Sequence, residues 1–335
     1  MSVFVSGKAY RPFAYPWAAD AAKVQVIDLH WDVNQVELTD DVRQYHSPGG
    51  LATAKVSHEV NKAIVKKLLC LFTELDRTVA EGYTRIIPIA KNNEIRNLLM
   101  THAFKEVVHQ RAYALAAETF GFSDDEWMEF HDYVEMRDKL DVMGDQMYDE
   151  EDRPEMKFCI GLSQILLGEG IGLFAAFVTL LNYKRQGRLM GFNDVNQWSL
   201  IDEQAHVENN IKILQAARKS LTEAENIALD KIILKMVRMF VEAEKRLISL
   251  IYKDGEQEDL TAAQVEDYIE YLGELRESAL GLRLARDVRP NPLEWMEWML
   301  GAKHDNFFEK RVTDYSHSKL EGTTDYRQYL HLLPQ

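Results

Sequence analysis

The stretch from Phe158 to Tyr183, FCIGLSQILLGEGIGLFAAFVTLLNY, most constrains how this chain can fold. It is long and apolar enough to suggest a transmembrane helix. Glu169 lies near its middle, however, and the rest of the chain has no matching membrane pattern. The sequence therefore predicts a helix buried at the centre of a soluble bundle. An ionised carboxylate in such a place is costly unless it is paired, protonated or bound to a metal.

The remaining sequence also indicates helices, and no period-2 alternation long enough for a strand is evident. Apolar residues at helical spacing over 56–83, after the breaker SPGG at 47–50, predict one long helix. A second helix is expected from Asn92 to Phe120, ending at Gly121. Capping boxes mark three further helix starts: Ser123 with Glu126, Thr222 with Glu225, and Thr261 with Gln264. We expect an all-α fold.

Composition narrows the class of protein. A chain of 335 residues with 46% hydrophobic content can bury a sizeable core, and a net charge of −15 argues against nucleic acid or an anionic membrane as a partner. Cys70 and Cys159 lie in apolar helical segments, as expected in a reducing cytosol. The first residues show no secretion signal. We expect a cytoplasmic, acidic protein that binds neither nucleic acid nor membrane.

The chain also suggests three parts. Residues 1–50 look like an irregular N-terminal arm, and 51–300 hold the helical domain. The last part, 301–335, loses apolar periodicity and resembles a flexible C-terminal tail.

Two Glu-x-x-His motifs give the buried carboxylate a context. Glu106 with His109 and Glu203 with His206 are the only such pairs among ten histidines, and residues three apart share a helix face. Roughly one match is expected by chance, so the pairs alone are weak. Di-iron and di-manganese carboxylate bundles, however, use one Glu-x-x-His from each of two helices and one carboxylate from each of two others. Glu169 supplies a third helix.

The fourth carboxylate should come from the helix predicted over 56–83, where Glu74 and Asp76 compete. Asp76 shares its face with apolar residues such as Phe72 and Val79, whereas Glu74 shares its face with Lys67 and points outward. Asp76 is therefore the predicted ligand.

Six side chains on four helices then form a candidate metal site: Asp76, Glu106, His109, Glu169, Glu203 and His206. Oxygen and imidazole ligands of this kind suit two ions of Fe or Mn and disfavour Zn. Fe is the first choice, and Mn or a mixed Mn/Fe pair is also compatible. The alternative, a plain bundle with buried salt bridges, requires basic partners on the same faces, and none is evident.

Over most of its length the chain resembles the small, radical-generating subunit of class I ribonucleotide reductase. The matching segments are HWDVNQVEL around Trp31, FTELD ending at Asp76, FKEVVHQRAY, LLGEGIGLFAAF around Glu169, WSLIDEQAH, NPLEWMEWML, and NFFEKRVTDY ending at Tyr315. The resemblance implies a ferritin-like helical bundle with a carboxylate-bridged di-metal site, and a homodimer.

The resemblance also implies roles for residues outside the ligand set. Tyr113 falls where the family keeps its stable tyrosyl radical. Trp31 and Asp202 resemble a relay that leads from His109 toward the surface, and Tyr315 matches the tail tyrosine that passes the radical to the partner. One departure is Ile201, where many members have Arg, which removes a charge beside the relay.

The implied function is that of a ribonucleoside-diphosphate reductase small subunit. A di-metal centre and O2 would generate the radical, and the large subunit would reduce ribonucleotides to deoxyribonucleotides. The terminal YLHLLPQ would dock on that large subunit, and an activating flavoprotein is a further candidate partner. Tyr326 and Tyr329 share the tail, so the relaying tyrosine stays open.

Two other functions fit part of the pattern. One is a ferritin-like di-metal oxidase acting on a bound small molecule, which would need no tail relay. The other is an iron store or a non-catalytic helical protein, although a storage shell usually has a much shorter chain.

Overall fold

Helices account for nearly all regular structure in the described part of the chain. The structure is a computed structural model that describes residues 2–7, 9–10 and 13–301. Within these residues there is no strand, only an isolated bridge near residue 257. The predicted all-α fold is confirmed. Tyr315 and the docking tail lie outside the described residues.

The chain divides into two units, Met1–Leu293 and Glu294–Gln335. The second contributes one described helix, α12 (Trp295–Gly301). The first unit holds all the other helices, and it includes the 50 residues predicted as an arm.

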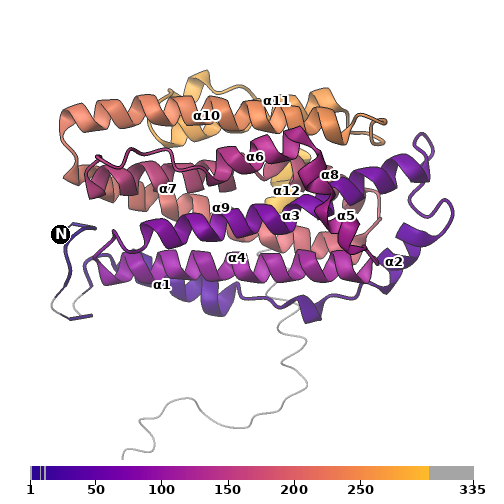
Figure 1. Cartoon of the computed structure of the whole chain (residues 1–335), viewed down its shortest axis with the longest axis horizontal. Helices are drawn as coiled ribbons and strands as arrows, with labels where there is room; N and C mark the ends of the chain where they lie inside the picture. The colour runs from indigo at the N-terminus through magenta and orange to yellow at the C-terminus, as the bar shows by residue number, and fades with distance from the viewer. Residues whose placement is uncertain (1, 8, 11–12, 302–335) are drawn as a thin grey trace, which may run out of the picture. The chain divides into compact units, whose positions relative to one another are not determined.

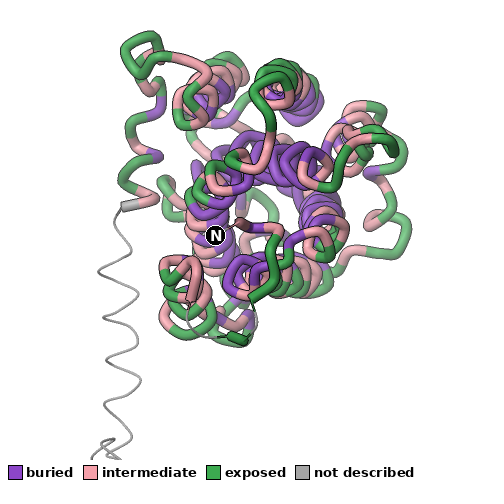
Figure 2. The backbone as a smooth tube through the Cα atoms, turned by 90° about the vertical axis from the view of Figure 1, so that its left-hand side faces the viewer, coloured by how far each residue is buried: buried purple, intermediate pink, exposed green. Residues whose placement is uncertain are grey.

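Four long helices form the centre of the first unit. They are α3 (His58–Ile86), α4 (Asn93–Thr119), α7 (Pro154–Gly170) and α9 (Met190–Ala217). Helix α3 packs along α4 and also against α7, while α7 packs along α9. Figure 2 shows the buried positions gathered on these central helices and the exposed ones on the outer helices and loops.

The other helices surround this centre. Helix α10 lies against α7, α6 and α11, and α8 lies against α9 (Figure 1). Their bounds are α1 (Pro16–Lys23), α2 (Thr39–His46), α5 (Asp124–Met128), α6 (Val134–Gly144), α8 (Phe174–Arg185), α10 (Glu223–Ile251) and α11 (Ala262–Ala279).

The predicted helix starts are confirmed by their caps. The Asn92 side chain accepts a hydrogen bond from the Ile95 N–H at 3.0 Å, which satisfies one of the unpaired donors at the start of α4. Gly121 has a φ of +76°, a left-handed conformation that ends the same helix and that favours glycine. All three capping boxes are present, at the starts of α5, α10 and α11.

The prediction of one continuous central helix was wrong, because the chain breaks after Gly170 and resumes at Phe174. Glycines at 168, 170 and 172 lower helix propensity there. Buried side chains satisfy the backbone groups that the break releases. Arg276 Nε donates to the Gly170 carbonyl at 3.1 Å, and the Ala175 N–H donates to Glu244 Oε2 at 2.9 Å. Glu244 is itself paired with the buried Lys139.

The predicted burial of this apolar segment is confirmed. By length and composition Pro154–Arg185 could cross a membrane, but its whole apolar window is buried inside the protein. Glu169, one residue before the end of α7, is fully buried. Cys70 and Cys159 are also buried, and neither forms a disulfide.

The N-terminal residues that position part of the site are ordered by short helices. Helix α1 packs on α4, and it continues directly into a π-helical turn, Val24–Asp28. Trp31 follows this turn and is buried. The irregular arm therefore carries local structure, and it brings an indole against the central helices.

Candidate metal centre

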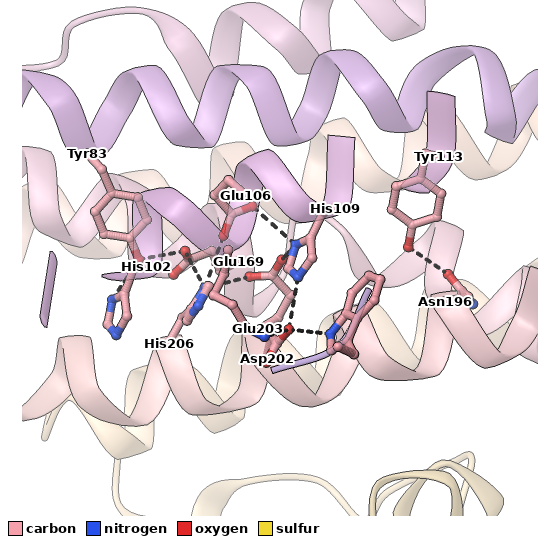
Figure 3. Close-up of polar contacts among 12 residues, drawn as sticks. Tyr83, His102, Glu106, His109, Tyr113, Glu169, Asn196, Asp202, Glu203 and His206 are labelled. Carbon is pink, nitrogen blue, oxygen red and sulfur yellow. Dashed lines mark hydrogen bonds and ion pairs between the residues drawn. The ribbon is translucent and has the colours of Figure 1, made fainter. Parts of the chain in front are cut away.

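The four central helices bring all six predicted ligands into one buried cluster. The cluster consists of two overlapping groups, and within each group the ligand atoms all lie within 4.8 Å of one another. The first comprises Asp76, Glu106, His109 and Glu203, and the second comprises Glu106, Glu169, Glu203 and His206. Glu106 and Glu203 belong to both groups, so each has the position of a bridging carboxylate (Figure 3).

Both histidines of the Glu-x-x-His motifs present the same imidazole nitrogen to the carboxylates. His109 Nδ1 lies 3.5 Å from Glu106 Oε2 and 3.2 Å from Glu203 Oε1. His206 Nδ1 lies 3.1 Å from Glu106 Oε1, 3.3 Å from Glu203 Oε2 and 3.2 Å from Glu169 Oε1. Both Nδ1 atoms therefore point inward, as expected for side chains on facing helices.

The cluster fits two divalent cations. Both oxygens of Glu106 and of Glu203, together with Asp76 Oδ2 and His109 Nδ1, are buried without a hydrogen-bond partner. Buried polar atoms normally have such partners, and an ion would satisfy these atoms. Four carboxylates face two imidazoles in this cluster, and two divalent ions would balance the four negative charges.

Burial makes the metal-free cluster retain protons. It raises the pKa of Glu169 to about 8, and it raises the pKa of Asp76 well above its ordinary value. Burial lowers the pKa of His109, but the charge of Glu106 and hydrogen bonds to Asp202 outweigh it, so the pKa rises. Metal ions must displace these protons, because ligands bind in their deprotonated forms.

The three predicted relay residues lie in contact beside the cluster. His109 Nε2 is 3.2 Å from Asp202 Oδ2, and Trp31 Nε1 donates to the same oxygen at 2.8 Å. The Trp31 and His109 rings stack at 5.7 Å. Sequence reasoning missed Lys105, whose Nζ lies 2.9 Å from Asp202 Oδ2. Its i,i+4 spacing to His109 was the available signal.

Electrostatics keep Asp202 ionised. Burial raises the pKa of Asp202, but the ammonium group of Lys105 and the hydrogen bond with His109 outweigh it and hold the pKa below its ordinary value. An acceptor that stays ionised fixes the tautomer of His109 with Nδ1 free for a metal.

A second group of side chains, also missed, surrounds Glu169. The Tyr83 hydroxyl donates to Glu169 Oε1 at 2.6 Å, and Asn210 Nδ2 donates to Glu169 Oε2 at 3.0 Å. His102 Nδ1 lies 3.2 Å from the Tyr83 hydroxyl, and its ring stacks on His206. Tyr83 is seven residues after Asp76, a spacing that indicates a shared helix face. These contacts hold the carboxylate in one orientation (Figure 3).

Tyr113 occupies an aromatic pocket farther along α4. Its hydroxyl donates to Asn196 Oδ1 at 3.3 Å. Its ring stacks on Phe72 at 4.2 Å and meets Phe192 edge-on at 6.1 Å. Burial, with the charge of Asp76, raises the pKa of this phenol. Phe177 also packs on Phe72.

The helical fold and its buried cluster define a ferritin-like protein with a carboxylate–histidine site of the di-metal type. The sequence model described as "Ribonucleotide reductase, small chain" matches residues 8–285. The chain therefore belongs to the ribonucleotide reductase small chain family, whose members carry a di-metal centre.

Individual relatives agree with this assignment. The protein named "Probable ribonucleoside-diphosphate reductase small subunit 048L" of Invertebrate iridescent virus 3 is 27% identical, over 93% of this chain and 85% of the viral protein. The ribonucleotide reductase R2 subunit of Clostridium botulinum shares the fold with a TM-score of 0.75 at 20% identity, over 88% and 91% of the two chains. The dimanganese(II) protein of Streptococcus sanguinis shares the fold with a TM-score of 0.70 at 16% identity, over 87% of this chain and 99% of that chain.

Metal binding should release protons and should strengthen as the pH rises. With a pKa of about 8, Glu169 is mostly protonated at neutral pH, and an ion must displace that proton. Apparent affinity for Mn(II) should rise up to about tenfold per pH unit for each proton displaced, between about pH 6 and 8. Titration calorimetry in buffers of different ionisation enthalpy measures the protons released.

The Glu169→Gln variant is the control, since it has no such proton to lose. It should bind more weakly and release fewer protons. An affinity for Mn(II) that is independent of pH across this range would contradict the protonated cluster.

Proposed function

We infer that this chain is the small subunit of a ribonucleoside-diphosphate reductase, in which Tyr113 would carry a radical and the six-residue cluster would hold the metal pair that supplies the oxidising power. The observation that carries this function is the buried cluster with two shared carboxylates, in a chain that matches the family model over most of its length. A di-metal oxidase of the same fold is not favoured, because the curated relatives carry the reductase name.

Each ligand has a definite part in holding the metals. Asp76 and His109 would hold one ion and Glu169 and His206 the other, and Glu106 and Glu203, which belong to both groups, would contribute to both. When bound, the ions supply the one-electron oxidising power, drawn from O2, that oxidation of a phenol requires. Fe is our first choice, and the same ligands accept Mn.

The surroundings of Tyr113 suit a long-lived radical. The phenol is fully buried, and aromatic rings cover it on two sides. Such packing excludes water and dissolved reductants from the ring. The hydrogen bond to Asn196 fixes the direction of the hydroxyl group without offering an acid or a base.

Trp31, Asp202 and His109 form the proposed path between the metal site and the large subunit. Asp202 accepts hydrogen bonds from both rings, so it connects the ligand imidazole to the indole through one oxygen atom. The path would continue through Tyr315 in the tail.

A test of the radical's position uses electron paramagnetic resonance. Protein loaded anaerobically with Fe(II) and then exposed to O2 should show a tyrosyl signal. The Tyr113→Phe variant should lose that signal, because phenylalanine cannot form it, while the variant still binds two ions per chain. An unchanged signal in the variant would place the radical elsewhere. Two bound ions with no signal in the parent would contradict the tyrosyl function.

An apolar patch on α4 and the neighbouring turn supports the proposed homodimer. Phe104 and Val107 are 47% and 54% exposed, and Ile27 is 52% exposed. Met100 lies on the same face of α4, four residues before Phe104, and Val24 and Val26 are exposed on the turn. Several large apolar side chains exposed together are characteristic of a protein interface.

A charge placed in this patch should separate the two copies. We expect Val107→Glu to sediment as a monomer, since a buried unpaired carboxylate at an interface is costly. The control is Ile227→Glu, which changes an apolar residue of similar exposure (51%) on α10, a helix that lies on the other side of the central helices from α4 (Figure 1). It should remain a dimer. A dimeric Val107→Glu would exclude this face as the interface.

Removal of residues 316–335 tests the proposed docking tail. The shortened protein should keep its metals and its tyrosyl signal, because the cluster lies within the first unit. It should lose reductase activity with the large subunit and should no longer compete with the full-length chain. Full activity after truncation would contradict tail docking.

A further inference from the structure

Lys105 is a fully buried cation beside the proposed relay. It lies on α4 directly before Glu106, and its side chain is 0% exposed. Its Nζ is 2.9 Å from Asp202 Oδ2 and donates to the Leu29 carbonyl at 3.0 Å. The same Nζ lies 5.7 Å from the centre of the Trp31 ring. One side chain therefore contacts every part of the Trp31–Asp202 connection.

Asp202 needs this cation because its indole partner is uncharged and its imidazole partner must lose the Nδ1 proton to bind a metal. Trp31 Nε1 and His109 Nε2 converge on the same Oδ2 atom, and Asp202 Oδ1 is buried without a hydrogen-bond partner. A buried carboxylate without an opposite charge is strongly disfavoured. The ion pair with Lys105 balances the carboxylate charge and directs Oδ2 toward both rings.

Many members of the family have Arg where this chain has Ile201, and Lys105 supplies the positive charge that is missing there. Ile201 lies beside Asp202 on α9, but the positive charge comes instead from the neighbouring helix α4. The Leu29 contact adds a positional effect, since it fixes the backbone two residues before Trp31.

We propose that Lys105 is a positioning residue of the radical relay, whose ammonium group holds the Asp202 carboxylate in the orientation that joins Trp31 to His109. The proposal rests on the proposed function for its relay part. Its effect on His109 is independent of radical transfer, because Asp202 orients the imidazole whether or not a radical forms. A cation near the indole face also raises the energy needed to remove an electron from Trp31. The radical would therefore pass through this ring without resting on it.

The test compares Lys105→Met and Lys105→Arg with the parent. Mn(II) binding to the small subunit alone is followed by calorimetry, which resolves the two sites. Tyrosyl radical decay is then followed after the Fe-loaded protein is mixed with the large subunit, nucleotide substrate and effector. Lys139→Met is the matched control, because it removes another buried lysine from a carboxylate, in the pair with Glu244.

Lys105→Met should weaken one of the two Mn(II) sites by about 10- to 100-fold, as expected when the partner of a ligating histidine is disturbed. Radical transfer to the large subunit should slow by at least about tenfold. Lys105→Arg should restore both values to within about threefold of the parent, because it keeps the charge. Lys139→Met should lower the unfolding temperature and leave both Mn(II) sites unchanged.

Parent-like Mn(II) affinity at both sites and parent-like radical transfer in Lys105→Met would overturn the proposal. Equal weakening of both sites in Lys105→Met and Lys139→Met would also overturn it, since that result indicates general destabilisation. If Lys105→Met does not fold, Lys105→Gln, which keeps a donor without the charge, takes its place. A parent that binds two ions but shows no radical and no reductase activity would refute the proposed function, while the affinity ratios still decide the role of Lys105.

Discussion

The burial of four carboxylates among apolar helices is the constraint on which the rest of this structure depends. Without opposite charge, such a cluster would repel itself, and no lysine or arginine in the described part of the chain neutralises the two shared glutamates. The helices therefore place two imidazoles inward and leave carboxylate oxygens unpaired at the centre.

The division of labour among buried charges follows from this constraint. Lys105 neutralises Asp202 outside the ligand set, and Lys139 neutralises Glu244 at the helix break. Both pairs are complete without a metal. Among the described residues, the six-residue cluster has no lysine or arginine partner, so electrostatics as well as ligand type favour metals at this place.

Local sequence signals predicted the helices, their caps and the ligands, because each depends on spacing within one helix. The Glu-x-x-His pairs and the apolar face of Asp76 are of this kind. The break after Gly170 was not predictable from periodicity, since it depends on Arg276 and Glu244, which are distant in sequence. Tyr83 was missed as a neighbour of the site, because the fold brings it to Glu169, which is 86 residues away in sequence.

The ligands span the chain from Asp76 to His206 and come from four different helices. Ions bound there would link these helices in the folded state only, so metal supply becomes part of folding stability. By mass action, free metal at about a hundred times its dissociation constant adds about 2.7 kcal/mol per site. Chains that lack their metals would unfold and be degraded first, so proteolysis would selectively remove the inactive subunits.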